Sequence, residues 1–212
     1  MNMDEIRATA HRMADAARAA ILPHFRHTAL LADNKHGEGG FDPVTEADRA
    51  AERAMRAVLA EARPRDGILG EEYGATEGES GLTWVLDPVD GTRAFLSGTP
   101  TWGVLIAVSD ASGPVYGLID QPYIGERFEG GQGHAAMTGP LGGRVLSARG
   151  DRPLSEAILF TTFPELDTRA EAAAFADLAR QVRLTRYGLD CYAYALVAAG
   201  QIDLVVETGL AP

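Results

Sequence analysis

The segment Trp-Val-Leu-Asp-Pro-Val-Asp-Gly-Thr at residues 84–92 constrains the fold more than any other part of the sequence. An apolar run that predicts a buried strand ends in Asp87, and a proline and a glycine then turn the chain sharply. Asp87 and Asp90 can therefore converge on one point, with the main-chain carbonyl of Val89 inside the same turn. Oxygen ligands of this kind suit Mg²⁺. Taken alone, the segment is better explained as a structural turn, because Asp followed by Pro is ordinary turn chemistry.

Two other segments also place acidic residues at the end of a strand or at the start of a helix. In residues 68–72, Glu71 follows a short apolar strand and could bridge metal ions or polarise a water. Taken alone, it is better explained as a solvated loop charge. In residues 42–48, Thr45 and Asp48 have the spacing of a capping box that starts a helix. The same spacing would place Asp48 at the helix mouth, beside a water or a metal, and both interpretations can hold together.

Together, the three segments put five acids on strand ends or helix starts within one stretch of the chain. A helix predicted to start at Thr92 adds free N–H groups and a positive dipole end, which favour a phosphate. Phosphatases that use two metal ions need such an acid cluster, because one ion generates hydroxide and the other stabilises the leaving oxygen. The combination therefore favours hydrolysis of a phosphate ester.

The apolar pattern of the 212-residue chain divides it into two parts, residues 1–150 and residues 151–212. We expect an α+β arrangement with antiparallel strands in the first part, including a hairpin, and alternating α/β elements in the second. The expected helices span residues 3–25, 46–62, 170–181 and 191–199; the expected strands span 67–70, 82–87, 102–109, 115–121, 157–161, 182–187 and 202–207, with weaker candidates at 126–130 and 144–147.

Charge and composition narrow the range of partners. The formal net charge of −11 argues against nucleic acid or an anionic membrane as a partner, whereas bound Mg²⁺ would still attract a small phosphorylated substrate. Cys191 is the single cysteine, which fits a reducing compartment. The N-terminus lacks the pattern of a signal peptide, and no stretch has the roughly 20 apolar residues that cross a bilayer. We therefore expect a cytoplasmic protein.

The ordered motifs Asp-Pro-Val-Thr-x-x-Asp, Gly-Glu-Glu and Asp-Pro-Val-Asp-Gly-Thr resemble those of the inositol monophosphatase family of Mg²⁺-dependent, lithium-sensitive phosphatases. The resemblance covers nearly the whole chain. It implies a layered α/β/α/β/α fold, two or three Mg²⁺ ions (with Mn²⁺ as a substitute), inhibition by Li⁺ and a homodimer. The roles it implies are metal binding by Glu71, Asp87, the Val89 carbonyl and Asp90; activation and orientation of water by Glu71, Thr92 and Asp48; phosphate binding by the amides of Gly91 and Thr92; and a mobile-loop lysine at Lys35.

Within this family, segments at residues 92–98, 102–103, 119–127 and 186–194 resemble histidinol-phosphatases. Histidinol phosphate carries an amine and an imidazole, and Asp190 and Glu207 could pair with such cations. Glu207 ends a strand, as a substrate-binding acid of the family does, and Arg186 is expected on the substrate side as well. Asp190 could equally be the N-cap of the helix that follows it.

We therefore expect hydrolysis of L-histidinol phosphate. The alternatives are the same chemistry on inositol monophosphate, a sugar phosphate or a nucleotide phosphate, and, from another class, a non-catalytic phosphate-ligand-binding protein. The family carries a further metal-binding Asp shortly after the position of Glu207, whereas this sequence ends at Pro212. We therefore expect this further Asp, and the last elements of the fold, to be missing. Their absence is the feature that favours the non-catalytic alternative.

Overall fold

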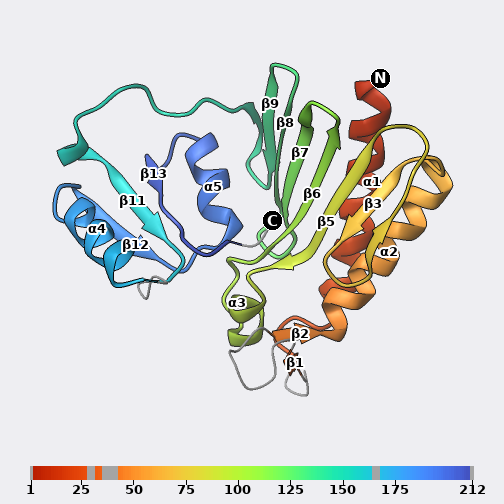
Figure 1. Ribbon diagram of the computed structural model, residues 1–212, viewed down its shortest axis with the longest axis horizontal. Coiled ribbons are helices and arrows are strands. Elements are labelled where there is room, and N and C mark those ends of the chain that lie inside the picture. Colours follow the sequence, from red (N-terminus) through yellow and green to blue (C-terminus); the bar gives the residue numbers. More distant parts are fainter. Residues whose placement is uncertain (1, 28–31, 35–42, 164–167, 211–212) are drawn as a thin grey trace.

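The computed structural model describes residues 2–27, 32–34, 43–163 and 168–210. Its elements form five layers, as expected from the sequence (Figure 1). Helices α1 (Met3–Ile21) and α2 (Glu46–Ala62) cover one face of an eight-stranded sheet. Helix α5 (Cys191–Ala198) lies between this sheet and a three-stranded sheet, and α4 (Arg169–Ala179) covers the outside of the smaller sheet.

The large sheet has the strand order β10-β9-β8-β7-β6-β5-β3-β4, and the small sheet the order β12-β11-β13. A separate pair joins β1 to β2. The strands are β1 (Ala32–Asn34), β2 (Pro43–Thr45), β3 (Gly67–Gly70), β4 (Gly74–Thr76), β5 (Thr83–Asp90), β6 (Gly103–Asp110), β7 (Gly113–Gln121), β8 (Glu126–Gly131), β9 (His134–Gly139), β10 (Gly142–Val145), β11 (Ile158–Thr161), β12 (Leu184–Tyr187) and β13 (Leu204–Val205). Two short helical segments, α3 (Thr92–Ser97) and a 3₁₀ turn (Leu154–Glu156), complete the described elements.

Helices α1 and α2 begin where their sequences supply a cap. The side chain of Asn2 accepts hydrogen bonds from the first turn of α1, and Thr45 forms the expected capping box with Asp48 at the start of α2. Each helix then buries one apolar stripe against the sheet, including Met13 and Met55 at 0% exposure. Helix α1 ends at Ile21 rather than at residue 25, because the proline at position 23 cannot continue the helical hydrogen bonding.

Strand β5 organises the large sheet. It pairs parallel with β3 and antiparallel with β6, and its register shifts between Asp87 and Asp90. The sequence predicted that the strand would end at Asp87, but it continues through Pro88, because an irregularity in the ladder is where a proline without an N–H is tolerated. The two acids therefore stand on either side of a bend.

Helix α5 holds the two sheets together. Ala195 packs with Phe128 of the large sheet, and Ala193 packs with Phe160 of the small sheet. Small residues on both sides of one helix allow both sheets to approach it closely. The long connection from β10 to β11 crosses from one sheet to the other beyond this helix (Figure 1).

Several local expectations were wrong. Strands β4 and β9 were not predicted, because both are short, glycine-containing and largely exposed or half-buried, so they lack an apolar alternation. The strand expected over residues 144–147 lies at Gly142–Val145, and that expected over 202–207 is limited to Leu204–Val205. Within the described ranges, no helix is long and apolar enough to cross a bilayer.

Candidate metal and phosphate site

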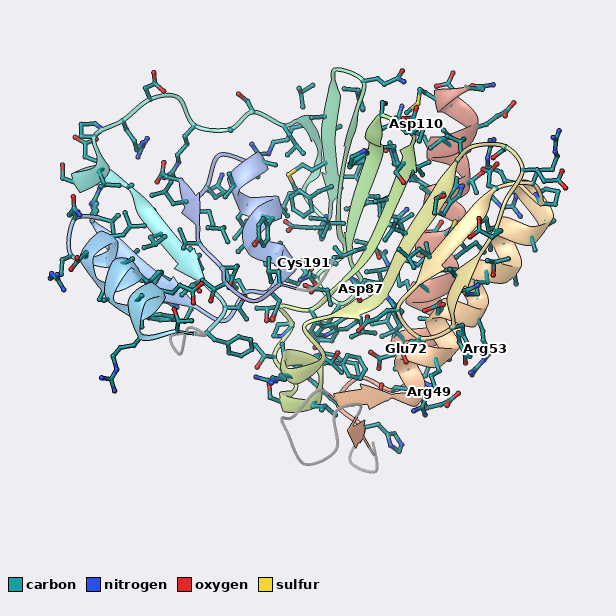
Figure 2. All side chains as sticks on the ribbon, viewed as in Figure 1. Arg49, Arg53, Glu72, Asp87, Asp110 and Cys191 are labelled. Atoms are coloured by element: carbon teal, nitrogen blue, oxygen red, sulfur yellow. The ribbon has the colours of Figure 1, made fainter. Side chains whose placement is uncertain are left out.

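The predicted acids meet where the ends of β3 and β5 approach the starts of α2, α3 and α5. Asp87 and Cys191 lie close together in the space between the two sheets (Figure 2) and line the same cavity. Residues more than 100 positions apart in the chain therefore share one site.

Glu71 and Asp87 come from neighbouring parallel strands. Gly70 is paired with Leu86, and the Glu71 N–H donates to the Leu86 carbonyl at 3.1 Å, so the two acids leave the sheet side by side. Burial raises the pKa of Asp87 well above its usual range, and the charges of Glu71 and Asp90 and a hydrogen bond with Glu71 add to the effect. These two carboxylates therefore lie close enough to repel each other.

Asp90 reaches across to the other half of the molecule. Its Oδ2 accepts the N–H of Cys191 at 2.6 Å, at the N-terminus of α5. Burial raises the pKa of Asp90, against the lowering effect of this hydrogen bond. A carboxylate at this end of a helix is favoured by the helix dipole.

Asp190 occupies the N-cap position of α5 but does not cap it. Its side chain makes no capping hydrogen bond, and its backbone has the unusual φ of 47°. The N-cap explanation for its side chain was therefore wrong, because Asp90 takes that role from a distance. The Asp190 carboxyl instead lies against Gly91, where an added Cβ would be 2.8 Å from it. Burial, and then the charges of Asp90 and Glu207, raise the pKa of Asp190 to about 7.

Asp48 is both a cap and a neighbour of the acids. Its Oδ2 accepts from the N–H of Thr45 at 2.8 Å and from the Thr45 hydroxyl at 2.5 Å. Only 2% of Asp48 is exposed. Burial raises its pKa, and the charge of Glu71 contributes to the shift. The capping box thus brings Asp48 to the edge of the acid cluster.

The turn after Asp90 places a glycine at the start of the short helix α3. Gly91 has a φ of 85°, which favours glycine, and it is the N-cap residue of α3. The hydroxyl of Thr92 donates to the Val89 carbonyl at 3.1 Å. The Thr92 oxygen can still accept a hydrogen bond from a water. The Val89 carbonyl oxygen keeps a second lone pair that is free to bind another partner.

Four of the acids, Asp87, Asp90, Asp190 and Glu207, line a polar cavity of about 730 Å³. Asp48 and Glu71 are not among the residues that line it. A second, apolar cavity of about 750 Å³ lies between the large sheet and α5, and both cavities are lined by Asp87 and Tyr194. The polar cavity is the one that suits a charged ligand, because its wall supplies the directional polar groups.

Glu207 is held in place by the small sheet. Its Oε1 accepts from the N–H of Thr162 at 2.8 Å and from the Thr162 hydroxyl at 2.9 Å, and its Oε2 accepts from Thr161 at 3.2 Å. Glu207 therefore lies in the wall of the polar cavity, and its role in binding a substrate stays a prediction. Arg186 was misplaced by the sequence argument: it is exposed on β12, an edge strand, and is not part of the cavity wall.

Sequence reasoning missed Arg93 and Phe163. Both line the polar cavity, and the Arg93 guanidinium carbon lies 4.8 Å from the centroid of the Phe163 ring. Arg93 also lowers the pKa of Asp190 against the larger opposing effects. A signal was available, because a basic residue in the first turn of a helix opposes the helix dipole unless acids lie nearby. Lys35 lies outside the described residues.

The donor set fits a hard cation. Every candidate ligand is an oxygen, and buried carboxylates beside other carboxylates need a positive partner. In the described part of the chain, no group of three or more Asp, Glu, His or Cys side chains lies in an arrangement that could already hold a metal ion. Asp90 is bonded to the N–H of Cys191, and Asp48 is bonded to Thr45.

Comparison with known proteins identifies the family of this chain. The sequence pattern of the inositol monophosphatase family matches residues 2–212. The chain is 39% identical over 212 residues to the chloroplastic bifunctional phosphatase IMPL2 of Arabidopsis thaliana, covering 99% of this chain and 59% of that protein. It is 36% identical to a histidinol-phosphatase of Streptomyces coelicolor, covering 98% and 79% of the two chains.

Among solved structures, an inositol monophosphatase from Zymomonas mobilis superimposes with a TM-score of 0.82 at 42% identity, covering 98% of this chain and 78% of that one. The chain therefore spans about three fifths of the Arabidopsis relative and nearly four fifths of the other two. With the family pattern, the relatives and the five-layered fold in agreement, this chain belongs to the inositol monophosphatase family.

Proposed function

We propose that this chain is a phosphomonoesterase that uses Mg²⁺ to hydrolyse L-histidinol phosphate to L-histidinol and phosphate. The observation that carries the proposal is the convergence of Asp87, Asp90 and Asp190 on one polar cavity. Two of these acids belong to the strand-end motif, and the third faces them from α5. A cluster with this much negative charge suits metal ions together with a cationic substrate.

The residues that would hold the ions are Glu71, Asp87, the Val89 carbonyl and Asp90. When bound, Mg²⁺ supplies positive charge that stabilises the phosphoryl group and the leaving oxygen. Thr92 orients a water for in-line attack on phosphorus, because its hydroxyl proton is given to the Val89 carbonyl and its oxygen can accept from that water. Asp48 is the second group proposed to orient it. A bond forms between the oxygen of that water and phosphorus as the phosphorus–ester oxygen bond breaks. One proton of the water passes to the departing oxygen, so that the alcohol and inorganic phosphate are released.

The phosphate would lie at the start of α3, where the amides of Gly91 and Thr92 have no hydrogen-bond acceptor within the helix. The rest of the substrate would extend into the cavity toward Asp190 and Glu207. These two carboxylates would pair with the ammonium and imidazolium groups of histidinol phosphate, whereas a polyol needs only hydroxyl partners. The name of the Streptomyces relative supports this substrate.

A second candidate is the same reaction on inositol monophosphate. It is favoured by the Zymomonas structure, whose identity to this chain is 42%. Arg93 at the cavity wall also reduces the negative potential that a cationic substrate would meet. The two candidates differ only in the group that fills the cavity beyond the phosphate.

The test is phosphate release from L-histidinol phosphate, inositol 1-phosphate and a nucleotide 3′-phosphate, each with Mg²⁺ and with EDTA. We expect the highest kcat/KM for histidinol phosphate when Mg²⁺ is present, and no release of phosphate in EDTA. A higher kcat/KM for inositol 1-phosphate would overturn the histidinol-phosphate assignment and favour the second candidate reaction. Binding of Mg²⁺ in a calorimetric titration without turnover of any ester would identify a non-catalytic ligand-binding protein and overturn the enzyme assignment.

A further inference from the structure

Glu52 is a buried carboxylate that contacts the backbone next to Glu71, one of the proposed metal ligands. It lies on α2 with 0% of its surface exposed. Its Oε2 accepts the N–H of Glu72 at 2.7 Å, and its Oε1 accepts the N–H of Tyr73 at 3.2 Å. These are the two amides that follow Glu71 in the chain. Glu72 is seen close to α2 in Figure 2.

Gly70, on the other side of Glu71, makes room for this carboxylate. A Cβ added at Gly70 would lie 2.0 Å from Oε1 of Glu52. Since the φ of Gly70 is not in the left-handed region, the glycine is required here for space rather than for backbone conformation. The Glu52 carboxylate therefore fills the place that a side chain at position 70 would take.

Arg56 completes the clamp from the next turn of α2. Its Nε donates to Oε1 of Glu52 at 2.8 Å, and its two terminal nitrogens donate to the Gly74 carbonyl and to the hydroxyl of Thr76. One ion pair thus holds the turn after β3 through Glu52 and strand β4 through Arg56. Only 18% of the Arg56 side chain is exposed.

The side chain of Glu71 is exposed and is hydrogen-bonded with Asp87, and the backbone that carries Glu71 also sets its position. On the side of β5, that backbone is tied by the bond from the Glu71 N–H to the Leu86 carbonyl. On the other side, it is tied by the two amides on Glu52. Charge-assisted bonds to a buried carboxylate are strong, and their loss would leave two amides without partners.

We propose that Glu52, oriented by Arg56, is a positioning residue that fixes the turn bearing Glu71 beside Asp87 and so sets the affinity of the site for Mg²⁺. The inference depends on the proposed use of Mg²⁺ by Glu71 and Asp87. It assigns Glu52 no contact with the ion or the substrate. Its effect is transmitted through the backbone amides of Glu72 and Tyr73.

The test compares Mg²⁺ binding to the 212-residue chain and to Glu52→Gln by calorimetry, alongside the thermal midpoint of each. Gln keeps the size but brings an NH₂ group toward two amide donors, so we expect Mg²⁺ affinity to fall about 10- to 100-fold. The matched control is Glu129→Gln, which removes another buried carboxylate bonded to an arginine, on β8 of the large sheet. We expect the control to lose thermal stability and keep its Mg²⁺ affinity.

The outcomes separate the two proposals. If the unmodified chain does not bind Mg²⁺, the proposed function fails. If it binds Mg²⁺ and Glu52→Gln binds equally well, the function stands and the positioning role is overturned. Should Glu52→Gln fail to fold, Arg56→Lys serves instead, because it keeps the charge and removes the fork that reaches Gly74 and Thr76. An Mg²⁺ affinity of Arg56→Lys equal to that of the unmodified chain would likewise overturn the inference.

Discussion

Two groups of buried carboxylates in this protein have the same chemistry and opposite surroundings. The frame carboxylates, Asp66, Asp120 and Glu129, each contact an arginine. The site carboxylates, Asp87 and Asp190, have other carboxylates among the neighbours that shift them. The fold pairs an acid with a guanidinium in the frame and groups acids together where we propose that a cation binds.

Glu129 illustrates the frame. It accepts from Arg7 at 2.6 Å, Tyr116 at 2.6 Å and His11 at 3.0 Å, and 8% of it is exposed. Burial alone would raise its pKa, but these hydrogen bonds outweigh burial and lower the pKa to about 2. Asp87 accepts one hydrogen bond from the Val89 N–H at 3.1 Å, which does not offset burial and the neighbouring carboxylates, and its pKa is raised. The partners, rather than the degree of burial, decide the sign of the shift.

The largest expected effect is on the site. Asp87→Asn should lower Mg²⁺-dependent turnover by at least about 1,000-fold, because it removes a charged ligand from the cluster. The same change should raise the thermal midpoint of the metal-free protein by about 2–6 °C, since it removes a repelled buried charge. Phosphate release and calorimetric scanning measure the two effects. Turnover near that of the unmodified chain would contradict the metal assignment.

The reverse pattern is expected in the frame. Glu129→Gln should lower the free energy of unfolding by about 2 kcal/mol, because Arg7 and Tyr116 lose a charged acceptor. Turnover at a temperature where the variant is folded should stay within about twofold of the unmodified value, since Glu129 is not part of the polar cavity. Urea denaturation and the phosphate-release assay check the two parts. A strong loss of turnover without loss of stability would break the distinction between frame and site.

Acidification should act on the two groups in opposite directions. The raised pKa of Asp190, about 7, means that its charge destabilises the fold at higher pH and that protonation relieves this as the pH falls from about 8 toward 4. The lowered pKa of Glu129, about 2, means that its stabilisation is complete above its usual pKa of 4.5 and is lost as the pH falls toward 2. Metal-free protein should therefore be most stable near pH 5.

Mg²⁺ distinguishes the two contributions. With saturating Mg²⁺ present, the gain of about 1–2 kcal/mol between pH 7 and pH 5 should vanish, because the ion compensates the site charges. The loss below pH 4.5 should remain, because the frame carboxylates already have arginine partners. Thermal unfolding across this pH range, with Mg²⁺ and with EDTA, gives both curves. Identical curves would show that the site carboxylates are not compensated by the ion.

The smallest expected effect concerns substrate choice. Asp190→Asn should raise the KM for histidinol phosphate about tenfold and leave the KM for inositol 1-phosphate within about twofold, because only the first substrate brings a cation to this position. Steady-state kinetics on both esters provides an internal control for the integrity of the metal site. Equal losses for the two esters would remove the reason for preferring the cationic substrate.

Much of the frame could be predicted from the sequence because local rules fix it. The capping box of Thr45 and Asp48 begins α2 at the predicted residue, and the hairpin of β6 and β7 pairs as its apolar alternation indicates. The acid motifs also lie where a strand ends or a helix starts. In each case, hydrogen-bonding groups a few residues apart determine the geometry, so the local structure can be predicted from residues that are close together in the sequence.

The partners of those acids could not be predicted, because they are brought together only by packing. Asp90 bonds to the N–H of Cys191, a residue more than 100 positions away, and so replaces Asp190 as the helix cap. The clamp of Glu52 on the amides beyond Glu71 likewise needs α2 to lie against β3. Arg186 was misplaced for the same reason, since its strand forms an edge of the small sheet.

The sequence by itself therefore determined which residues carry charge at strand ends and helix starts, because backbone geometry and capping act over one turn of chain. The tertiary structure decided which carboxylate meets an arginine and which meets another carboxylate, because those distances depend on how two sheets pack on α5. Burial then strengthens the effect of each pairing on the pKa, since charge interactions are strong only where water is excluded.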